Sequence, residues 1–170
     1  MKKLRLLLTI LITCSAFAIP VQVRAQVPVA PNPDHESMLH SKDPQLAKNK
    51  RFVYDFWREV FEAAHMDLAP SYMAENYVQH NPRVPTGRQA FIDFFTKMRK
   101  PAPIEPRVKA PLVAMLADGD LVVMAFAREY PDPQEPAKTY TTTWFDMFRI
   151  ADGKIAEHWD PAVKPPKQQP

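Results

Sequence analysis

Residues 139–160 read TYTTTWFDMFRIADGKIAEHWD, and this stretch decides the fold. Threonine, aromatic and β-branched residues dominate it, and such residues favour strands. Asp152-Gly153 interrupts the stretch with a dipeptide that is typical of tight hairpin turns. We therefore expect two antiparallel strands here, at 139–150 and 154–160.

The chain directly before this hairpin shows the same strand pattern, whereas the chain further upstream shows a helical pattern. Residues 108–117 and 121–130 have a similar composition and are separated by Asp118-Gly119, so they predict a second hairpin. Residues 43–98 instead carry apolar side chains every three or four positions, which indicates helices. Helices followed by antiparallel strands predict an α+β fold, with the helices on one face of a curved sheet.

Local signals set the limits of three expected helices. Asp43 before Pro44 caps a long helix that runs to about Met66. A short second helix follows and ends near Asn76. Thr86, with a glutamine three residues later, forms a capping box that should begin the third helix.

The segment 1–25 has the pattern of a secretory signal peptide. A basic start precedes the apolar run 6–19, and small residues then suit cleavage between Ala25 and Gln26. We therefore expect the protein to be periplasmic or secreted, with no membrane association after cleavage. The alternatives are an uncleaved anchor, for which the run is short, and a lipoprotein acylated at Cys14.

The expected cleavage changes the meaning of the charge. The whole chain carries 22 Lys and Arg against 19 Asp and Glu, but four basic residues and no acidic residue lie in 1–25, which leaves 18 against 19. Binding to nucleic acid thereby loses its support in the composition. The expected organisation is a signal peptide at 1–25, an irregular lead-in at 26–42, one domain at 43–160 and a proline-rich tail at 161–170.

Scarce residue types exclude several classes of protein. The three glycines, Gly87, Gly119 and Gly153, lie too far apart to form a dinucleotide-binding or phosphate-binding loop. A single cysteine excludes an internal disulfide and a multi-cysteine zinc site.

Asp146 is the first candidate for chemistry. Strand alternation puts it on one face of 139–150, between Trp144 and Phe148. A carboxylate that aromatic side chains enclose is a candidate general acid or base. The alternative is a salt bridge to Arg83, Arg149 or Lys109 at the sheet surface.

Two histidines could complete such a site. His80 lies in the polar segment 77–82, as a proton-transfer group or as part of a solvated turn. His158 and Asp160 share a face at the end of the last strand and could join Asp146 in one pocket. Two histidines and a carboxylate could also bind a metal, but no close histidine spacing supports this, so we expect none.

The order of these motifs resembles the SnoaL-like polyketide cyclases of the nuclear-transport-factor-2-like superfamily. The resemblance covers about residues 45–160. The segments that carry it are YVQHNP at 77–82, GRQAF at 87–91, WFDMFR at 144–149, DGKI at 152–155 and EHWD at 157–160.

This resemblance implies a cone-shaped fold, in which three helices pack on a strongly curved, mostly antiparallel sheet that encloses an apolar pocket. It also implies a homodimer through the sheet face, and chemistry without a metal or an organic cofactor. In the family an aspartate of the Asp-x-Phe-Arg strand is the acid/base of an aldol cyclisation, and Asp146 matches it. His80 and His158 resemble positions that line the same pocket.

The expected function is that of an exported lyase or isomerase, acting by aldol-type cyclisation or by proton abstraction alpha to a carbonyl in a small apolar compound. The alternative is a non-catalytic periplasmic binding module for a small apolar ligand. Catalytic roles fall to Asp146, His80 and His158. The expected substrate-binding residues, among which Tyr54 and Trp57 also suit the core, are Trp57, Tyr54, Tyr77, Gln79, Trp144, Phe148 and Asp160.

Overall fold

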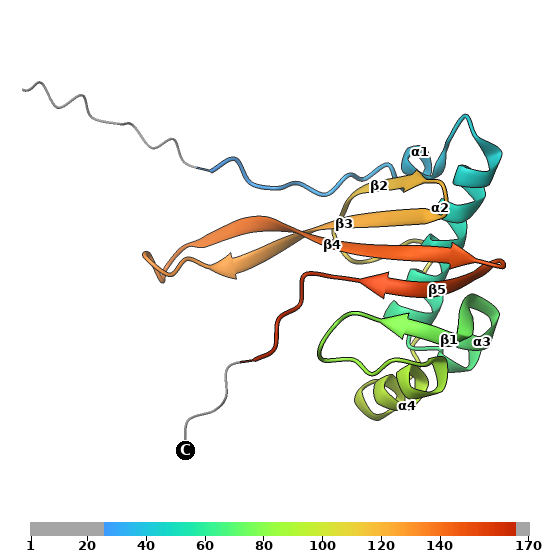
Figure 1. The fold of residues 1–170 in the computed structure, drawn as a ribbon. Helices are drawn as coiled ribbons and strands as arrows, with labels where there is room; N and C mark the ends of the chain where they lie inside the picture. The colour runs from blue at the N-terminus through green and yellow to red at the C-terminus, as the bar shows by residue number, and fades with distance from the viewer. Residues whose placement is uncertain (1–25, 166–170) are drawn as a thin grey trace, which may run out of the picture.

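The computed structural model describes residues 26–165 and contains helices and one sheet (Figure 1). The helices are α1 (His35–Leu39), α2 (Pro44–Phe56), α3 (Ala69–Tyr72) and α4 (Arg88–Met98), with a π-helical turn at Trp57–Glu62 and a 3-10 turn at Met66–Leu68. The strands are β1 (Met73–Gln79), β2 (Leu112–Asp118), β3 (Leu121–Pro131), β4 (Thr139–Ala151) and β5 (Lys154–Trp159).

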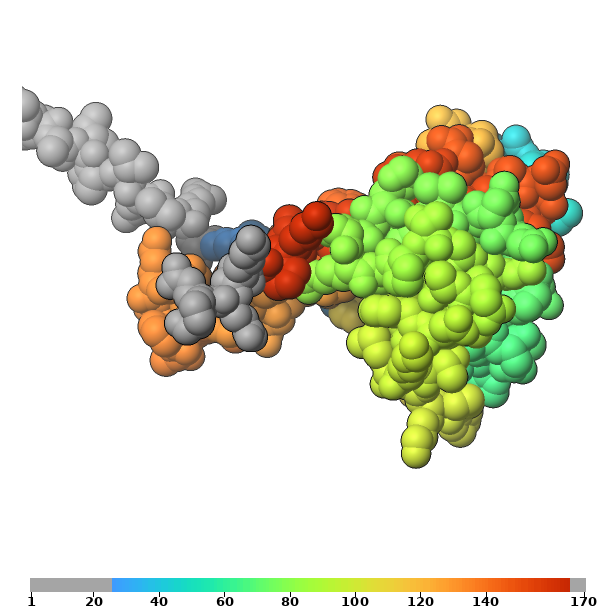
Figure 2. Space-filling model, turned by 60° about the horizontal axis from the view of Figure 1, so that its bottom comes forward, coloured from blue at the N-terminus to red at the C-terminus, as the bar shows by residue number. Residues whose placement is uncertain are grey.

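The five strands form one sheet in the order β1-β5-β4-β3-β2. All neighbours are antiparallel except β1 and β5, and register shifts in three of the four pairs mark irregularities of the kind that bend strands. β3 and β4 extend beyond the other strands as a long hairpin, which stands out from the body (Figures 1 and 2). The predicted α+β class with a mostly antiparallel sheet is confirmed.

The predicted start of α2 and the two predicted hairpin turns are confirmed. The Asp43 carboxylate accepts hydrogen bonds from two N–H groups of the first turn of α2, beside Pro44. Gly119 and Asp152-Gly153 have positive φ in the two hairpin turns, a conformation that asparagine, aspartate and glycine adopt most readily.

The core lies between α2 and the inner face of the sheet. Val53, Phe56 and Val60 are buried on α2 and the turn that follows it, and the Phe56 ring lies 5.9 Å from that of Phe148 on β4. Burying each such side chain stabilises the fold by about 1.5–3 kcal/mol. This packing fixes α2 across β4 and leaves the space beyond Phe148 to be closed by α4.

The lead-in 26–42 is not irregular throughout, which corrects the prediction. It contains α1, which is capped by Asp34 and anchored by the buried side chains of His35 and Leu39. The Lys50 ammonium donates to two carbonyls at the end of α1, at 2.6 and 2.5 Å. Tertiary contacts therefore order a segment whose prolines suggested a linker, and the described chain has four helices rather than three.

Two other boundaries also differ. The second helix, α3, ends at Tyr72 rather than near Asn76, because the chain from Met73 onward pairs with β5. Thr86 does not cap α4, since Gly87 is the N-cap and no side chain bonds there. The Thr86 hydroxyl bonds instead to the backbone of Gln79, so a tertiary contact replaces the capping box.

The signal-peptide prediction for 1–25 lies outside the described residues, as does the tail beyond residue 165. Within 26–165, the helices are too short or too polar for any of them to span a bilayer.

Candidate active site

A cavity of about 260 Å³ lies between α2, α4 and the inner face of β1, β4 and β5. Its apolar wall includes Phe56, Trp57, Phe61, Phe91, Phe95, Trp144 and Phe148. Its polar lining includes Tyr77, Gln79, Asn81, Asp146, His158 and Asp160. An apolar cleft with a few convergent polar groups is the usual form of a small-molecule site.

The π-helical turn places Trp57 in the wall. Trp57 Nε1 donates to Glu62 Oε1 at 3.1 Å, across the five-residue spacing that this turn provides. The Glu62 carboxylate also accepts from the backbone N–H groups of Lys109 and Ala110, at 2.8 Å each. The indole stacks on Phe126 at 4.6 Å, so both its edge and its face are held.

A carboxylate and an imidazole meet at the buried end of the cavity. Phe148 on β4 pairs with His158 on β5, which brings Asp146, two residues before Phe148, to the same place on the inner face. His158 Nε2 lies 3.0 Å from Asp146 Oδ1. Both side chains are buried, with Asp146 4 % and His158 7 % exposed.

The other ring nitrogen reveals where the protons lie. The backbone N–H of Asn81 donates to Gln79 Oε1 at 3.0 Å, and Gln79 Nε2 donates to the Tyr77 hydroxyl at 2.9 Å, which fixes the orientation of the amide. His158 Nδ1 lies 2.9 Å from the same Oε1 and must therefore carry a proton. One further proton then lies between His158 Nε2 and Asp146 Oδ1, held by either partner.

Asp146 Oδ2 has no hydrogen-bond partner among the described residues, although it is fully buried. Leaving a buried acceptor unpaired costs about 1–3 kcal/mol. Asp146 lines the cavity, but this oxygen is covered in the structure, so a ligand reaches it only when the side chains around it shift. The arrangement can accept a proton from a bound molecule, or return one.

Two more polar groups complete this end of the site. Asp160 accepts from Asn81 Nδ2 at 2.6 Å and from the backbone N–H of Ala162 at 2.8 Å. Burial, together with the nearby charges of Asp160 and Asp146, raises the pKa of Tyr77 well above its ordinary value. Tyr77 therefore keeps its proton at neutral pH and can donate it in a hydrogen bond.

The same residues could hold a divalent cation. Asp146, His158 and Asp160 each offer an atom within 4.8 Å of the others, and the His158 Nδ1–H donates to an amide oxygen, as in many metal sites. The ligand set considered from the sequence was two histidines and one carboxylate, whereas the structure brings together one histidine and two carboxylates. A cation would compete with the shared proton for the same lone pairs.

Eight of the ten residues predicted for the site line the cavity: Trp57, Tyr77, Gln79, Trp144, Asp146, Phe148, His158 and Asp160. The alternative of a surface salt bridge for Asp146 is wrong, because Asp146 is buried beside His158. Arg149 lies on the opposite face of β4 and pairs with Asp120 and Glu157 instead.

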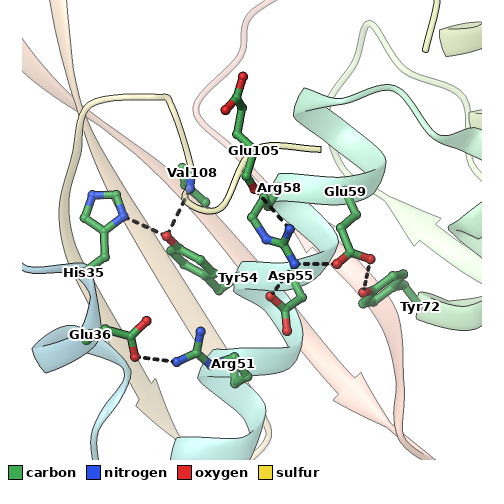
Figure 3. A network of polar contacts seen from close by, with 10 residues as sticks. All are labelled: His35, Glu36, Arg51, Tyr54, Asp55, Arg58, Glu59, Tyr72, Glu105 and Val108. Atoms are coloured by element: carbon green, nitrogen blue, oxygen red, sulfur yellow. Dashed lines mark hydrogen bonds and ion pairs between the residues drawn. The ribbon is translucent and has the colours of Figure 1, made fainter. Parts of the chain in front are cut away.

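His80 and Tyr54 were wrongly placed at the cavity. His80 lies on the outer face, where its Nε2 is 2.7 Å from Glu157 Oε1 and its ring stacks on Trp159 at 4.9 Å. The Tyr54 hydroxyl instead bonds to His35 Nδ1 at 2.8 Å and to the backbone N–H of Val108 at 3.0 Å, away from the cavity (Figure 3).

Asn81, Arg83 and Arg128 also line the cavity, and none of them was predicted as a site residue. A signal existed for Arg128, since strand alternation puts it on the same face as the buried Phe126. Asn81 and Arg83 lie in the loop after β1, where no periodicity applies.

Fold and cavity together define a small α+β pocket protein with a buried carboxylate–imidazole pair. The family model for a SnoaL-like domain matches residues 53–158, which is more than half of the chain. The chain belongs to this family, and it has the nuclear-transport-factor-2-like fold that the sequence resemblance implied.

Several solved structures are similar. A candidate polyketide cyclase from Acidithiobacillus ferrooxidans is 20% identical over 71% of this chain and 89% of its own, with a TM-score of 0.48. An LEH-like epoxide hydrolase from M. tuberculosis is 15% identical over 70% of this chain and 81% of its own, with a TM-score of 0.49. At these levels the likeness carries no conclusion about the site or the activity of this chain, and its family assignment rests on the family model. No protein of curated function matches the chain.

Proposed function

We propose that the protein is an acid–base enzyme that needs no cofactor and removes a proton alpha to a carbonyl in a small, largely apolar compound. One observation carries this proposal: a buried Asp146–His158 pair that shares a proton, with Asp146 Oδ2 left unpaired in an apolar cavity. Such a pair has the means to take a proton and to pass it on.

In the proposed reaction, Asp146 Oδ2 accepts the proton as the C–H bond breaks. The electron pair moves onto the carbonyl oxygen and gives an enolate. Tyr77 is the donor for that oxygen, because its hydroxyl accepts from Gln79 and its own proton remains to be given. In an aldol cyclisation, the enolate carbon attacks a second carbonyl, and the oxygen of that carbonyl takes the proton from Asp146. In an isomerisation, Asp146 returns the proton to another carbon.

A non-catalytic binding module would use the same aromatic wall. The unpaired oxygen argues against it, because a binder of apolar ligands gains nothing from a buried carboxylate that costs stability. The two functions differ in what they require of Asp146: an enzyme needs it, whereas a binder does not.

Solvent-deuterium exchange tests the proposal without knowledge of the natural substrate. A panel of small aryl and alkyl ketones is incubated with the protein in D₂O, and NMR follows the loss of the alpha protons. We expect exchange above the buffer rate for the ketones that fit, and a fall of at least about 10²-fold in Asp146→Asn.

A panel in which no ketone exchanges faster than in buffer would contradict the proposal, and so would full activity of Asp146→Asn. Exchange should also survive treatment with a chelator. Its loss would show that Asp146, His158 and Asp160 act through a bound cation.

We also propose export and a homodimer. The outer face of the sheet exposes Leu116 by 66 % and Phe145 by 51 %, beside Val123 and Met147. Exposed apolar patches of this kind mark association surfaces. Light scattering should show a dimer for the wild type and a monomer for Phe145→Lys, and N-terminal sequencing of the exported protein should begin at Gln26.

A further inference from the structure

Charge and burial divide the cavity into two ends. Asp146 and Asp160 lie at the inner end, with the buried His158. The charged residues at the outer end are Arg83 and Arg128, and both are exposed. A molecule in the cavity therefore meets carboxylates at one end and guanidinium groups at the other.

Arg128 is held in place without an acidic partner. Its guanidinium carbon lies 4.0 Å from the centroid of the Trp144 ring, and within residues 26–165 it forms no ion pair. By contrast, Arg51, Arg58 and Arg149 each pair with an aspartate or glutamate. Stacking on an indole uses the face of a guanidinium group and leaves its N–H edge for an anion.

Arg83 comes from the loop between β1 and α4. Its Nε donates to the backbone carbonyl of Val163 at 2.8 Å, which fixes the side chain, and its terminal nitrogens have no partner within the described part of the chain. Figure 1 shows the connection between β1 and α4 on the same side of the molecule as the projecting β3–β4 hairpin. The two arginines thus line the same cavity from separate segments, and both are exposed.

We propose that the ligand carries a carboxylate at the end remote from its reacting carbon, and that Arg83 and Arg128 bind this group at the opening. The planar fork of a guanidinium group matches the two oxygens of a carboxylate. Asp160 repels an anion from the inner end, where the Asp146–His158 pair with its shared proton carries no net charge, so the ligand enters with its apolar body first. A cavity of about 260 Å³ admits one ring or a short chain.

This inference deepens the proposed function, and it rests on that function only for the reacting end of the ligand. Binding of the carboxylate depends only on Arg83 and Arg128, which we call the rim of the cavity. The two ideas can therefore fail separately, and the experiment is arranged to show which one fails.

The probes are hydrocinnamate and its amide, which match in size and shape and differ in charge. Tryptophan fluorescence of the mature protein reports binding, because Trp57 and Trp144 both line the cavity. We expect the wild type to bind the carboxylate about tenfold more tightly than the amide, and we expect salt to weaken this preference. The double variant Arg83→Gln/Arg128→Gln should bind both probes equally.

Four further single variants, Arg128→Gln among them, separate charge from packing and from global effects. Arg128→Lys should keep part of the preference and Arg128→Met should lose as much as Arg128→Gln, since Met retains contact with Trp144 but not the charge. Arg51→Gln is the matched control, because it also removes one exposed positive charge but lies away from the cavity. It should leave the preference unchanged.

Equal affinity of the wild type for the two probes would overturn the inference. An unchanged preference in the double variant, or failure of both probes to bind, would overturn it as well. Asp146→Asn should lose exchange and keep the carboxylate preference. If Asp146→Asn loses exchange but the Arg83→Gln/Arg128→Gln variant keeps the carboxylate preference, only the anionic ligand is refuted. If the double variant loses the preference but Asp146→Asn keeps full exchange, only the proposed function is refuted.

Discussion

The fold buries two histidines to the same extent and uses them differently. His35 and His158 are each 7 % exposed, and each has a hydrogen-bond partner at Nδ1, at 2.8 and 2.9 Å. His35 lies in α1, where it bonds to Tyr54 (Figure 3). His158 lies on β5 and also faces a carboxylate in the cavity.

Proton positions account for the difference. The Tyr54 hydroxyl accepts from the backbone N–H of Val108, so its own proton is available to His35 Nδ1. Burial, with the nearby charge of Arg107, lowers the pKa of His35, which therefore stays neutral and holds α1 in place. His158 instead donates from Nδ1 and shares its other proton with Asp146. Burial alone does not mark a functional histidine, whereas an unpaired carboxylate oxygen beside it does.

The same substitution at both histidines gives the largest expected contrast. His158→Gln should reduce ketone exchange by about 10²–10⁴-fold, because Asp146 loses the partner with which it shares a proton. His35→Gln should leave exchange within twofold of the wild type when both are assayed below their unfolding transitions. Equal losses in the two variants would mean that the comparison is wrong.

The order should reverse for stability. Tyr54→Phe leaves the N–H of Val108 and the ring of His35 without their partner, and it should lower the free energy of unfolding by about 1–3 kcal/mol. Asp146→Asn replaces the buried carboxylate whose Oδ2 lacks a partner by an amide that can still bond to His158 Nε2, so it should be close to neutral. Urea unfolding measures both changes. A large destabilisation by Asp146→Asn would assign that residue a structural role.

Acid should act on the His35 contact. Its pKa is lowered in the folded state from 6.5, so the unfolded chain binds the proton first, and stability should fall as the pH drops below about 6.5. The difference in melting temperature between the wild type and His35→Gln should shrink across this window, because only the wild type pays the cost of keeping this ring neutral. A difference that does not change with pH would contradict the neutral state of His35.

His80 should matter least. It pairs with Glu157 and stacks on Trp159 on the outer face, and this contact lowers the pKa of Glu157. His80→Ala should change exchange by less than about twofold, since exposed pairs contribute little. A loss comparable to that of His158→Gln would restore His80 to the catalytic site.

Local backbone preferences and strand alternation were enough to predict several parts of the fold. The Asp-Gly turns, the α+β order and the inward face of β4 with Asp146 all follow from local backbone preference and strand alternation. Strand alternation also shows that Gln79 and His80 could not both face the cavity. Gln79 and His80 are neighbours on one strand edge, so an inward Gln79 required an outward His80.

Contacts between distant segments decided the rest. α1 forms because His35 and Lys50 find partners across the chain, which a proline-containing stretch does not reveal. The π-helical turn depends on Glu62, whose carboxylate binds the backbone near residue 110. The rim arginines come from a loop and from β3, so only the folded chain brings them together.

The proton between Asp146 and His158 can be observed directly. Nitrogen NMR on protein with isotope-labelled histidine distinguishes the protonated from the unprotonated ring nitrogens at neutral pH. We expect Nδ1 of His158 to be protonated and Nε2 to share a strongly deshielded proton that disappears in Asp146→Asn. An unprotonated Nδ1, or a spectrum of His158 that does not respond to Asp146→Asn, would contradict the acid–base pair.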